Sequence, residues 1–489
     1  MIPPISLEIA VLGIGLFLLL YEAFSNERSK SPVAWLGILG LGIVLGLSFF
    51  IHPPVAATAY DRFYSSDSFA LFFKRFALIT TIIVIAMSLE YKTVLRKFIF
   101  SSAGDAGLGE FYSLPVFTCA GLMWMASAVD FVFIFVSLEL VTISFYVLVT
   151  YTRRNGQSLE AGVKYLILGA LSTGFLVYGI TWIFGITGET NLQAISAYAA
   201  GLKETNVPLM FGVVLVLIAL GFKIAAVPFQ LWVPDVYQGA PTPVTAFLSV
   251  GSKAAGFIVL LRVLDAFMGT PFLRVKILAL FAVIAAATLI YGNLAAMPQE
   301  NLKRLLAYSS IGHAGYLLVA VASIGALHAL QAIPYYLAGY LLMTLLAFVV
   351  MTVVSSHTGG DEIAHFNGLA RRSPLLAFGM LVAMASLAGV PLTAGFLGKF
   401  LVFESAMEQH HYRLVAVGAV TVAAGFYYYL KVVRAMYWKD PSDDSRIPVS
   451  PMAGTIILVL CVLIFVLGVY PQPIFDMLKP VAGSIVAVR

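Results

Sequence analysis

The sequence predicts an all-α polytopic membrane protein, on the strength of its composition and the length of its apolar stretches. Of its 489 residues, 61% are hydrophobic and only 11% are charged, and the mean hydropathy is +0.96. A soluble domain needs a more polar surface than this composition supplies. Apolar windows of about 20 residues, enough for a helix to cross a ~30 Å hydrocarbon core, recur throughout the chain. They lack the strict alternation of barrel strands, so we expect helices.

The windows divide the chain into about fourteen predicted transmembrane helices. In order they lie near residues 5–24, 32–51, 69–90, 110–128, 130–152, 160–186, 207–227, 242–264, 274–296, 304–325, 327–355, 374–404, 412–436 and 450–475. The first window has no basic residue before it, contains Glu8 and lacks a small-residue cleavage site. We therefore interpret it as a span and not as a signal peptide.

Basic residues in the connecting loops predict the orientation. Loops after odd-numbered windows contain Arg28, Lys30, Lys92, Arg96, Lys97, Arg153, Arg154, Lys303, Arg304, Arg371, Arg372, Lys439 and Arg446. Loops after even-numbered windows contain little beyond Arg62, Lys203, Arg274, Lys276 and Arg413. The positive-inside rule then places the odd loops in the cytoplasm and both termini on the outer side. The net charge of +5 follows largely from this asymmetry and does not indicate a nucleic-acid partner.

The residue types that hold cofactors are scarce. Cys119 and Cys461 both lie inside apolar windows, and the sequence has no C-x-x-C or H-x-x-x-H motif. The glycines of G-L-G-I-V-L-G (40–46) lie within a span and do not form the dinucleotide fingerprint, so close helix packing explains them better. We expect no metal, nucleotide or electron carrier in this chain.

Two windows are predicted to be broken near a lysine. In GFKIAAVPFQLWVPD (221–235), Lys223 precedes two prolines, and in SLAGVPLTAGFLGKF (386–400), a Gly-Val-Pro sequence precedes Lys399. Proline removes a backbone donor and interrupts a helix, and unwound backbone at membrane depth needs protein or a water-filled cavity around it. The opposite order of lysine and break in the two windows is what an inverted repeat gives, and such breaks indicate a transport site. The alternative is an ordinary proline or glycine kink.

Charged and titratable residues inside the windows are the candidate site. They are Glu139, Lys164, Lys223, Lys253, His313 and Lys399. Each charge at membrane depth costs roughly 2.5–3.5 kcal/mol on insertion scales, so such residues indicate an ion or proton path. Lys164 follows Glu160 by four residues, so a surface ion pair is its alternative. A hydrogen-bonded packing histidine is the alternative for His313.

A glutamate with several lysines suits proton transfer. Glu139 lies about 13 Å into its span, counted from Asp130 at 1.5 Å per residue. A glutamate–lysine pair about 4 Å apart interacts by about 4 kcal/mol at an effective dielectric near 20. Small helix motions then load or unload a proton, because a buried lysine changes its protonation readily whereas arginine stays charged.

Four stretches of the chain strongly resemble the subunit N family of bacterial respiratory complex I, the proton-pumping NADH:quinone oxidoreductase. They are GFKIAAVPFQLWVPDVYQGAPTPVTAFLSVGSKAAG (221–256), EAGVKYLILGALSTGFLVYG (160–179), NLKRLLAYSSIGHAGYLL (301–318) and GVPLTAGFLGKF (389–400). The resemblance implies fourteen spans, with inverted five-helix repeats over 110–265 (helices 4–8) and 266–437 (helices 9–13). Residues 1–109 then form helices 1–3, and residues 438–489 contain helix 14.

The resemblance also implies roles and partners. Glu139 matches the span-five glutamate, Lys164 and Lys223 the lysines of spans six and seven, Lys253 the connecting lysine, and Lys399 the lysine of broken span twelve. In that family the glutamate–lysine pair modulates the proton affinity of the central lysines, and the span-twelve lysine serves the exit side. NAD, FMN, Fe–S clusters and quinone are then expected in partner subunits. The chain is expected to contact the lipid bilayer and other membrane-arm subunits in a bacterial inner membrane, and to transfer protons.

Three features bear on the relatives within this family. Subunits L and M and the sodium/proton antiporters have a sequence closer to L-P-D-A-H, where this chain has Pro234 to Gln238. The long C-terminal lateral helix of subunit L is not expected after the last window. Gln230 replaces the usual histidine of V-P-F-H, which puts a relay role there in doubt. The alternatives are a secondary cation/proton antiporter, a subunit of the photosynthetic plastoquinone-reducing complex, and a structural subunit with relic charges.

Overall fold

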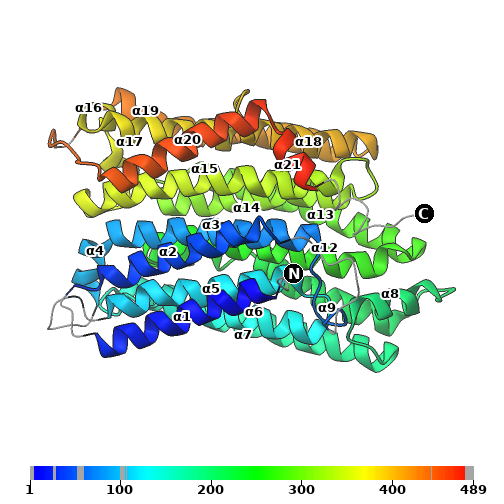
Figure 1. Ribbon diagram of the computed structural model, residues 1–489. Helices are drawn as coiled ribbons and strands as arrows, with labels where there is room; N and C mark the ends of the chain where they lie inside the picture. The colour runs from blue at the N-terminus through cyan, green and yellow to red at the C-terminus, as the bar shows by residue number, and fades with distance from the viewer. Residues whose placement is uncertain are drawn as a thin grey trace.

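The computed structural model describes residues 5–25, 29–51, 60–99, 105, 107–441 and 443–478. Within these residues all the regular elements are helices, which confirms the all-α fold class. Figure 1 shows the long helices side by side and roughly parallel, with the loops gathered at the two ends. Arg28 of the first basic loop and residues 479–489 of the last predicted segment lie outside the described residues.

The helices follow the predicted windows closely. Their bounds are α1 Ser6–Phe24, α2 Ser31–Ser48, α3 Ser68–Glu90, α4 Lys92–Phe98, α5 Leu108–Ser127, α6 Phe131–Val149, α7 Gly156–Thr187, α8 Leu192–Ala200, α9 Val207–Ile224, α10 Val233–Gly239, α11 Thr242–Phe247, α12 Lys253–Met268, α13 Pro271–Ala296, α14 Leu302–Ala322, α15 Ala329–Thr358, α16 Leu369–Arg372, α17 Pro374–Ala388, α18 Ala394–Glu408, α19 Tyr412–Trp438, α20 Pro451–Val469 and α21 Gln472–Leu478. A π-helical segment, Leu248–Ser252, joins α11 to α12, and a 3-10 helix covers Ile363–Phe366. The short helices α4, α8, α10 and α16 lie outside the predicted windows, and α21 lies partly outside the last one.

Twelve helical segments in the described part of the chain are long and apolar enough to span a membrane. The other two predicted windows coincide with α5 and with the pair α17 and α18, which the break shortens. Fourteen crossings, the inverted repeats and the four-part division of the chain remain predictions.

Polar side chains fix several helix starts. Asp67 accepts a hydrogen bond from the Ala70 amide at 2.7 Å, and Asp130 accepts one from the Val132 amide at 2.8 Å. These carboxylates satisfy backbone donors that the first turn of a helix leaves free. The helices α3 and α6 therefore each begin at a defined residue, directly after a loop.

Both predicted breaks are present. α9 ends at Ile224, where Ala225 has a φ of 63°, and the chain resumes helical structure only at Val233. α17 ends at Ala388, and Gly389, with a φ of 93°, turns the chain away from the helix axis. Glycine adopts this left-handed conformation without steric cost. The two breaks leave helix ends, with their free carbonyl groups, inside the protein.

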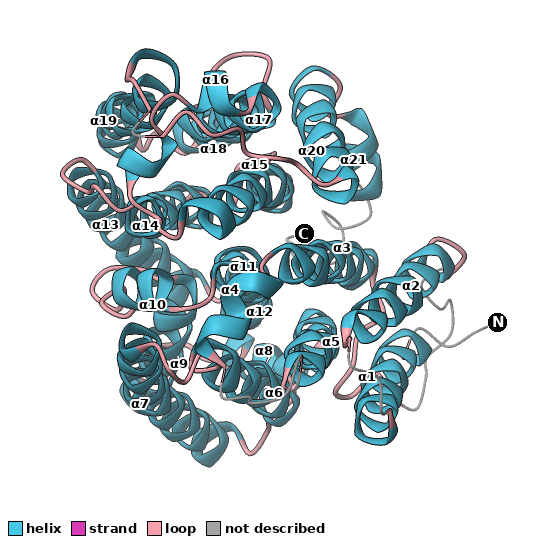
Figure 2. Cartoon of the chain, turned by 90° about the vertical axis from the view of Figure 1, so that its left-hand side faces the viewer, coloured by secondary structure: helices cyan, strands magenta, loops and turns pink. Residues whose placement is uncertain are grey.

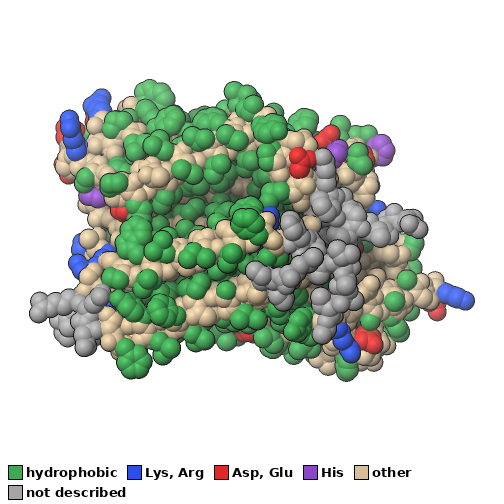
Figure 3. All heavy atoms as spheres, in the orientation of Figure 1, with side chains coloured by type: hydrophobic (Ala, Val, Ile, Leu, Met, Phe, Trp, Pro, Cys, Tyr) green, Lys and Arg blue, Asp and Glu red, His purple; other side chains and the backbone are tan. Residues whose placement is uncertain are grey.

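The buried centre of the bundle is formed by the 242–268 segment, α14 and α15. Lys253 lies on the first of these. The apolar windows of the 242–268 segment and of α14 are completely buried, and that of α15 is 94% buried. By contrast α1, α2, α7, α13, α19 and α20 expose one apolar side. Figure 3 shows that apolar side chains cover the middle of the visible face and that charged side chains gather at its two ends. In Figure 2, α10 lies between α7 and α14, and it packs on both.

Candidate functional site: a buried lysine path

Lys223 lies in the last turn of α9, directly before the first break. Its side chain is only 4% exposed, and Nζ donates a hydrogen bond of 2.5 Å to Thr142 Oγ1 on α6. Glu139, three residues before Thr142, accepts a hydrogen bond of 2.8 Å from Thr173 Oγ1 on α7. Thr142 of α6, Thr173 of α7 and Lys223 of α9 line one small pocket.

Glu139 and Lys223 thus bind different hydroxyl groups in this conformation, and the Glu–Lys pair that approaches and separates with small helix motions stays a prediction. No ion pair within 4.0 Å joins Glu139 to Lys223 among the described contacts. The Thr142 hydroxyl accepts a hydrogen bond from Lys223, and the Thr173 hydroxyl donates one to Glu139. Glu139 is partly exposed on the flank of the bundle, where Val136 and Ile143 of the same helix face outward.

Lys164 lies apart from the buried lysines, near the start of α7. Its side chain is 42% exposed, and Nζ lies 2.7 Å from both Glu160 Oε1 and Asp235 Oδ2. Asp235 also pairs with Arg304 Nη1 at 2.8 Å. The alternative that the sequence left open, an i,i+4 surface pair with Glu160, is thus formed in the structure. Asp235, 71 residues away, is a partner that the sequence did not predict.

Lys253 is the first residue after the π-helical segment and is buried against α14. Its Nζ donates to the carbonyl and hydroxyl oxygens of Ser310. Tyr340 OH donates to the same hydroxyl at 2.9 Å, and Tyr237 OH lies 3.2 Å from it. Ser249, one turn before Lys253, is hydrogen-bonded to Tyr340 OH at 2.9 Å. The lysine therefore lies in a cage of hydroxyl groups and has no carboxylate partner among the described residues.

His313 lies one turn after Ser310 on α14 and is fully enclosed. Its Nδ1 is 2.7 Å from Tyr336 OH, and its Nε2 is 3.1 Å from Tyr429 OH. Tyr429 OH is also bound by Ser309. Both ring nitrogens therefore have a hydroxyl partner, which suits a neutral packing histidine and equally suits a group that passes a proton between two tyrosines.

Lys399 reaches back into the second break. Its Nζ donates hydrogen bonds of 2.8 Å to the carbonyl oxygens of Leu387 and Ala388, the last residues of α17. The same nitrogen lies 5.0 Å from the centre of the Tyr316 ring. The C-terminal end of a helix carries about half a negative charge, so backbone dipoles and an aromatic face hold the lysine.

A polar cavity of about 570 Å³ opens among loops that follow odd-numbered windows. Its lining includes Gln238, Ala240, Asn301, Lys303 and Asp361. Lys303 Nζ lies 2.9 Å from Asp361 Oδ2 and 3.1 Å from the Ala240 carbonyl oxygen. Burial acts to raise the pKa of Asp361, but the Lys303 charge and a hydrogen bond from Ser355 outweigh it and hold that pKa below its usual range.

Sequence reasoning missed the hydroxyl groups and this cavity. Tyrosines and serines within apolar windows resemble ordinary span residues, and their partners lie 23 to 120 residues away in the chain. Gln230, which stands where the family usually has histidine, is buried, and its Oε1 has no hydrogen-bond partner in the ranges that the structure describes. No group of three or more His, Cys, Asp or Glu side chains able to hold a metal ion occurs among the described residues.

Comparison with known proteins shows which family this chain matches. Residues 128–425 match the model of the family described as NADH:quinone oxidoreductase/Mrp antiporter, TM. The chain is 39% identical to NADH-quinone oxidoreductase subunit N of Desulforamulus reducens over 98% of both chains, and 40% identical to that of Heliobacterium modesticaldum over 97% of both.

Solved structures agree with this match. A chain of respiratory complex I from Thermus thermophilus is similar with a TM-score of 0.79 and 32% identity, covering 96% of this chain and 98% of that one. A chain of the Mrp complex from Dietzia shares the fold with a TM-score of 0.84 at 20% identity, covering 99% of this chain and 98% of that one.

Proposed function

The chain belongs to the NADH:quinone oxidoreductase/Mrp antiporter family of membrane proteins, and from this premise we propose that it is a proton-translocating, non-redox subunit in the membrane arm of an NADH:quinone oxidoreductase. Relatives that match nearly its whole length are named as subunits of that enzyme. NAD, FMN, Fe–S clusters and quinone belong to partner subunits in this proposal. The odd-numbered loops face the bacterial cytoplasm, both termini face outward, and lipid and neighbouring subunits cover the apolar flanks.

The observation that carries the proposal is the way in which Lys223, Lys253 and Lys399 are held. All three are nearly inaccessible, and within the described part of the chain their Nζ atoms bind hydroxyl or carbonyl oxygens and no carboxylate. Fixed ion pairs hold a lysine in its charged form, whereas hydroxyl and carbonyl partners leave the amine form within reach. Three such lysines fit proton carriers better than structural charges.

The cavity supports uptake from the cytoplasmic side. Lys303 at the cavity and Ser310 beside Lys253 lie seven residues apart on α14, two turns along one helix face and about 10 Å at 1.5 Å per residue. Tyr237 on α10, next to Gln238 of the cavity lining, also reaches Ser310. A proton taken up here has hydroxyl groups along its way to Lys253.

Packing supports transfer between the lysines. A Cβ added to Gly256 on α12 would lie 3.4 Å from Lys223 Cβ, so the helices of Lys223 and Lys253 are in close contact. On the other side of Lys253, the His313 and Tyr316 rings are 6.1 Å apart, and Tyr316 contacts Lys399. The proposed order is cavity, Lys253, His313 and Lys399, with Glu139 and Lys223 loading the path from the flank and Lys164 acting at its half-exposed edge.

Pumping by the assembled, reconstituted oxidoreductase tests the proposal. Lys253→Met removes the amine but keeps an unbranched apolar side chain of similar length. We expect the Lys253→Met complex to assemble normally. Its NADH-driven proton uptake should fall to a small fraction of the wild-type rate. Lys203→Met, at an exposed loop lysine, is the matched control and should pump normally. Wild-type pumping by an assembled Lys253→Met complex would contradict the proposed path.

A secondary cation/proton antiporter is the second candidate, because the Mrp chain shares the fold. That function needs no NADH. Proton movement driven by an imposed sodium gradient, with no response to NADH and quinone, would favour it over the first candidate.

A further inference from the structure

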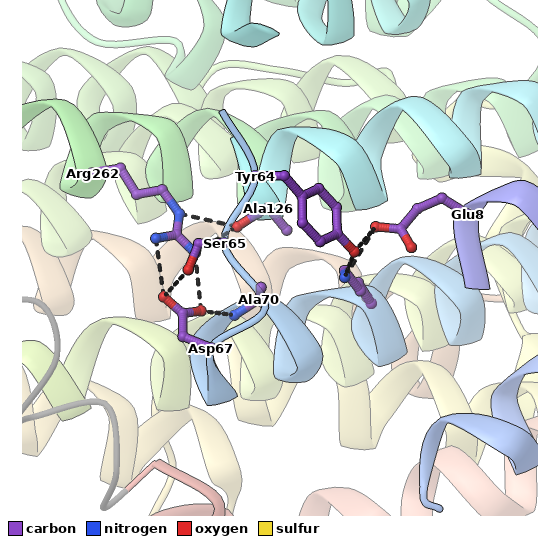
Figure 4. A network of polar contacts seen from close by, with 8 residues as sticks. Glu8, Tyr64, Ser65, Asp67, Ala70, Ala126 and Arg262 are labelled. Atoms are coloured by element: carbon purple, nitrogen blue, oxygen red, sulfur yellow. Dashed lines mark hydrogen bonds and ion pairs between the residues drawn. The ribbon is translucent and has the colours of Figure 1, made fainter. Parts of the chain in front are cut away.

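A second buried polar cluster lies outside the lysine path, among α1, α3 and the segment that precedes α3. It consists of Glu8, Tyr64 and Lys74, which we call the N-terminal triad. Glu8 and Lys74 are completely buried and Tyr64 is 2% exposed. Figure 4 shows Glu8 from α1 and Tyr64 from the loop pointing toward each other.

The three polar groups form a closed triangle. Lys74 Nζ lies 3.0 Å from Glu8 Oε1 and donates a hydrogen bond of 2.7 Å to Tyr64 OH. Tyr64 OH in turn donates to the same Glu8 Oε1 at 3.0 Å. One carboxylate oxygen therefore receives both donors.

The other oxygen of Glu8, Oε2, is buried and has no hydrogen-bond partner among the described residues. An unpaired ionised oxygen in an apolar interior is costly, and a protonated carboxyl group relieves most of that cost. Oε2 is therefore the oxygen of this carboxyl group that is open to a proton, because Oε1 already accepts both donors.

Stabilisation of the fold is a weak reason for burying these groups. Exchanging a buried ion pair for well-packed apolar side chains is often neutral or stabilising. Ionisable residues within spans are therefore taken as functional until shown otherwise. The triad has the chemistry of the lysine path, a glutamate and a lysine joined by a hydroxyl, at a place where the family resemblance predicted no role.

We propose that the N-terminal triad is a separate proton-binding site, at which Glu8 Oε2 takes up and releases one proton. On uptake the Glu8 carboxylate becomes a neutral acid while Lys74 remains an ammonium group, so the net charge of the triad changes from zero to +1. Release reverses the step, and no electron moves. Segment 60–67 connects Tyr64 to the exposed Arg62, which places the triad close to the end of the bundle formed by the loops after even-numbered windows.

Three other ionisable groups lie near the triad among the described residues: the buried Cys119 thiol of α5, Asp67 at the start of α3, and Arg262 of α12. Asp67 and Arg262 hold each other through two contacts, of 3.0 and 3.1 Å, and Arg262 also donates to the Ala126 carbonyl oxygen (Figure 4). Their charges are therefore mutually compensated, and neither side chain hydrogen-bonds to Glu8.

The Asp67–Arg262 pair also links the triad to the lysine path. Ser65, next to Tyr64 in the chain, donates to Asp67 Oδ2 at 3.1 Å. Arg262 lies on the helix that begins with Lys253, nine residues further along it. The triad is thus connected to α12 through the Tyr64–Ser65 main chain and the side-chain contacts of Ser65, Asp67 and Arg262. The proposal itself does not rest on the proposed function, because its test detects the protonation of one carboxyl group and not pumping.

Infrared difference spectroscopy of the assembled complex tests the site. Spectra recorded between acidic and alkaline buffer should contain a carbonyl stretch of a buried protonated carboxyl group that Glu8→Gln abolishes. Glu189→Gln removes a carboxylate that is 41% exposed and paired with Arg62, and it should leave this band unchanged. A spectrum that Glu8→Gln does not alter would overturn the proposal and make the triad a structural ion pair.

A second variant covers the case in which Glu8→Gln does not assemble. Tyr64→Phe keeps both charged groups and removes one hydrogen bond to Glu8 Oε1. We expect the carboxyl band to remain and to move to higher frequency, because the carbonyl loses a donor. A band at the wild-type frequency in Tyr64→Phe would assign it to another acid and overturn the proposal.

Discussion

Replacing Lys399 by arginine separates a proton carrier from a fixed positive charge. Lys399 Nζ is 2.8 Å from each of two carbonyl oxygens at the end of α17. With about half a negative charge at that helix end, the ammonium is favoured by about 3 kcal/mol at 2.8 Å and an effective dielectric near 20. This is roughly a hundredfold in population, so the contact still leaves the amine form accessible. Less than about 10⁻⁵ of a guanidinium is deprotonated at neutral pH.

The assay is NADH-driven proton uptake by reconstituted complexes carrying Lys399→Arg or Lys399→Ala, with assembly checked on native gels. As a carrier, Lys399 should lose pumping on replacement by arginine almost as fully as by alanine. Lys431→Arg, at a lysine paired with Glu300, is the control and should pump normally. If Lys399→Arg restores pumping, Lys399 is a fixed charge, and the proton leaves by another route.

Three further predictions concern the rest of the path. Lys223→Ala should leave the complex assembled but strongly lower pumping and coupled quinone reduction, and near-normal pumping in the same assay would argue against a carrier. Glu139→Gln should impair pumping more than Glu139→Asp, which keeps the charge while retracting it from Thr173; equal damage would mean that geometry matters more than charge. Asp361→Asn should lower the unfolding temperature of the complex, since leaving Lys303 unpaired costs about 3–5 kcal/mol. Because the pKa of Asp361 is lowered, its contribution should persist above about pH 4 and disappear as the solution becomes more acidic; a loss near neutral pH would contradict this.

The sequence predicted the helices and the breaks because both depend on local chemistry. Apolar length alone locates a span, and the Pro228 and Gly389 regions interrupt a helix whatever surrounds them. The depth of Lys223 and Lys253 followed from counting residues into each span, and both are buried. For Lys399 the count left an interface position open, and it is buried as well. These inferences needed no knowledge of which helix packs on which.

The contacts of the lysines did not follow from the sequence because they are made between distant segments. Lys253 binds Ser310, 57 residues away, and Lys223 binds Thr142, 81 residues away. No periodicity marks Ser310 or Thr142 within its apolar window. The π-helical segment before Lys253 was equally unpredictable, since its residues, LSVGS, suit an ordinary helix. For Lys164 the spacing to Glu160 did identify one partner, because i,i+4 contacts are local.

Because α17 ends at the break, the partners of the Lys399 ammonium group are main-chain atoms, which side-chain mutagenesis does not detect. The groups that neutralise this lysine are the main-chain carbonyls of Leu387 and Ala388, which every substitution at those positions retains. Alanine scanning therefore passes over them without effect, however strongly they hold the ammonium group. Only a change in the backbone itself, such as an ester in place of an amide bond or an altered helix end at Gly389, removes this partner.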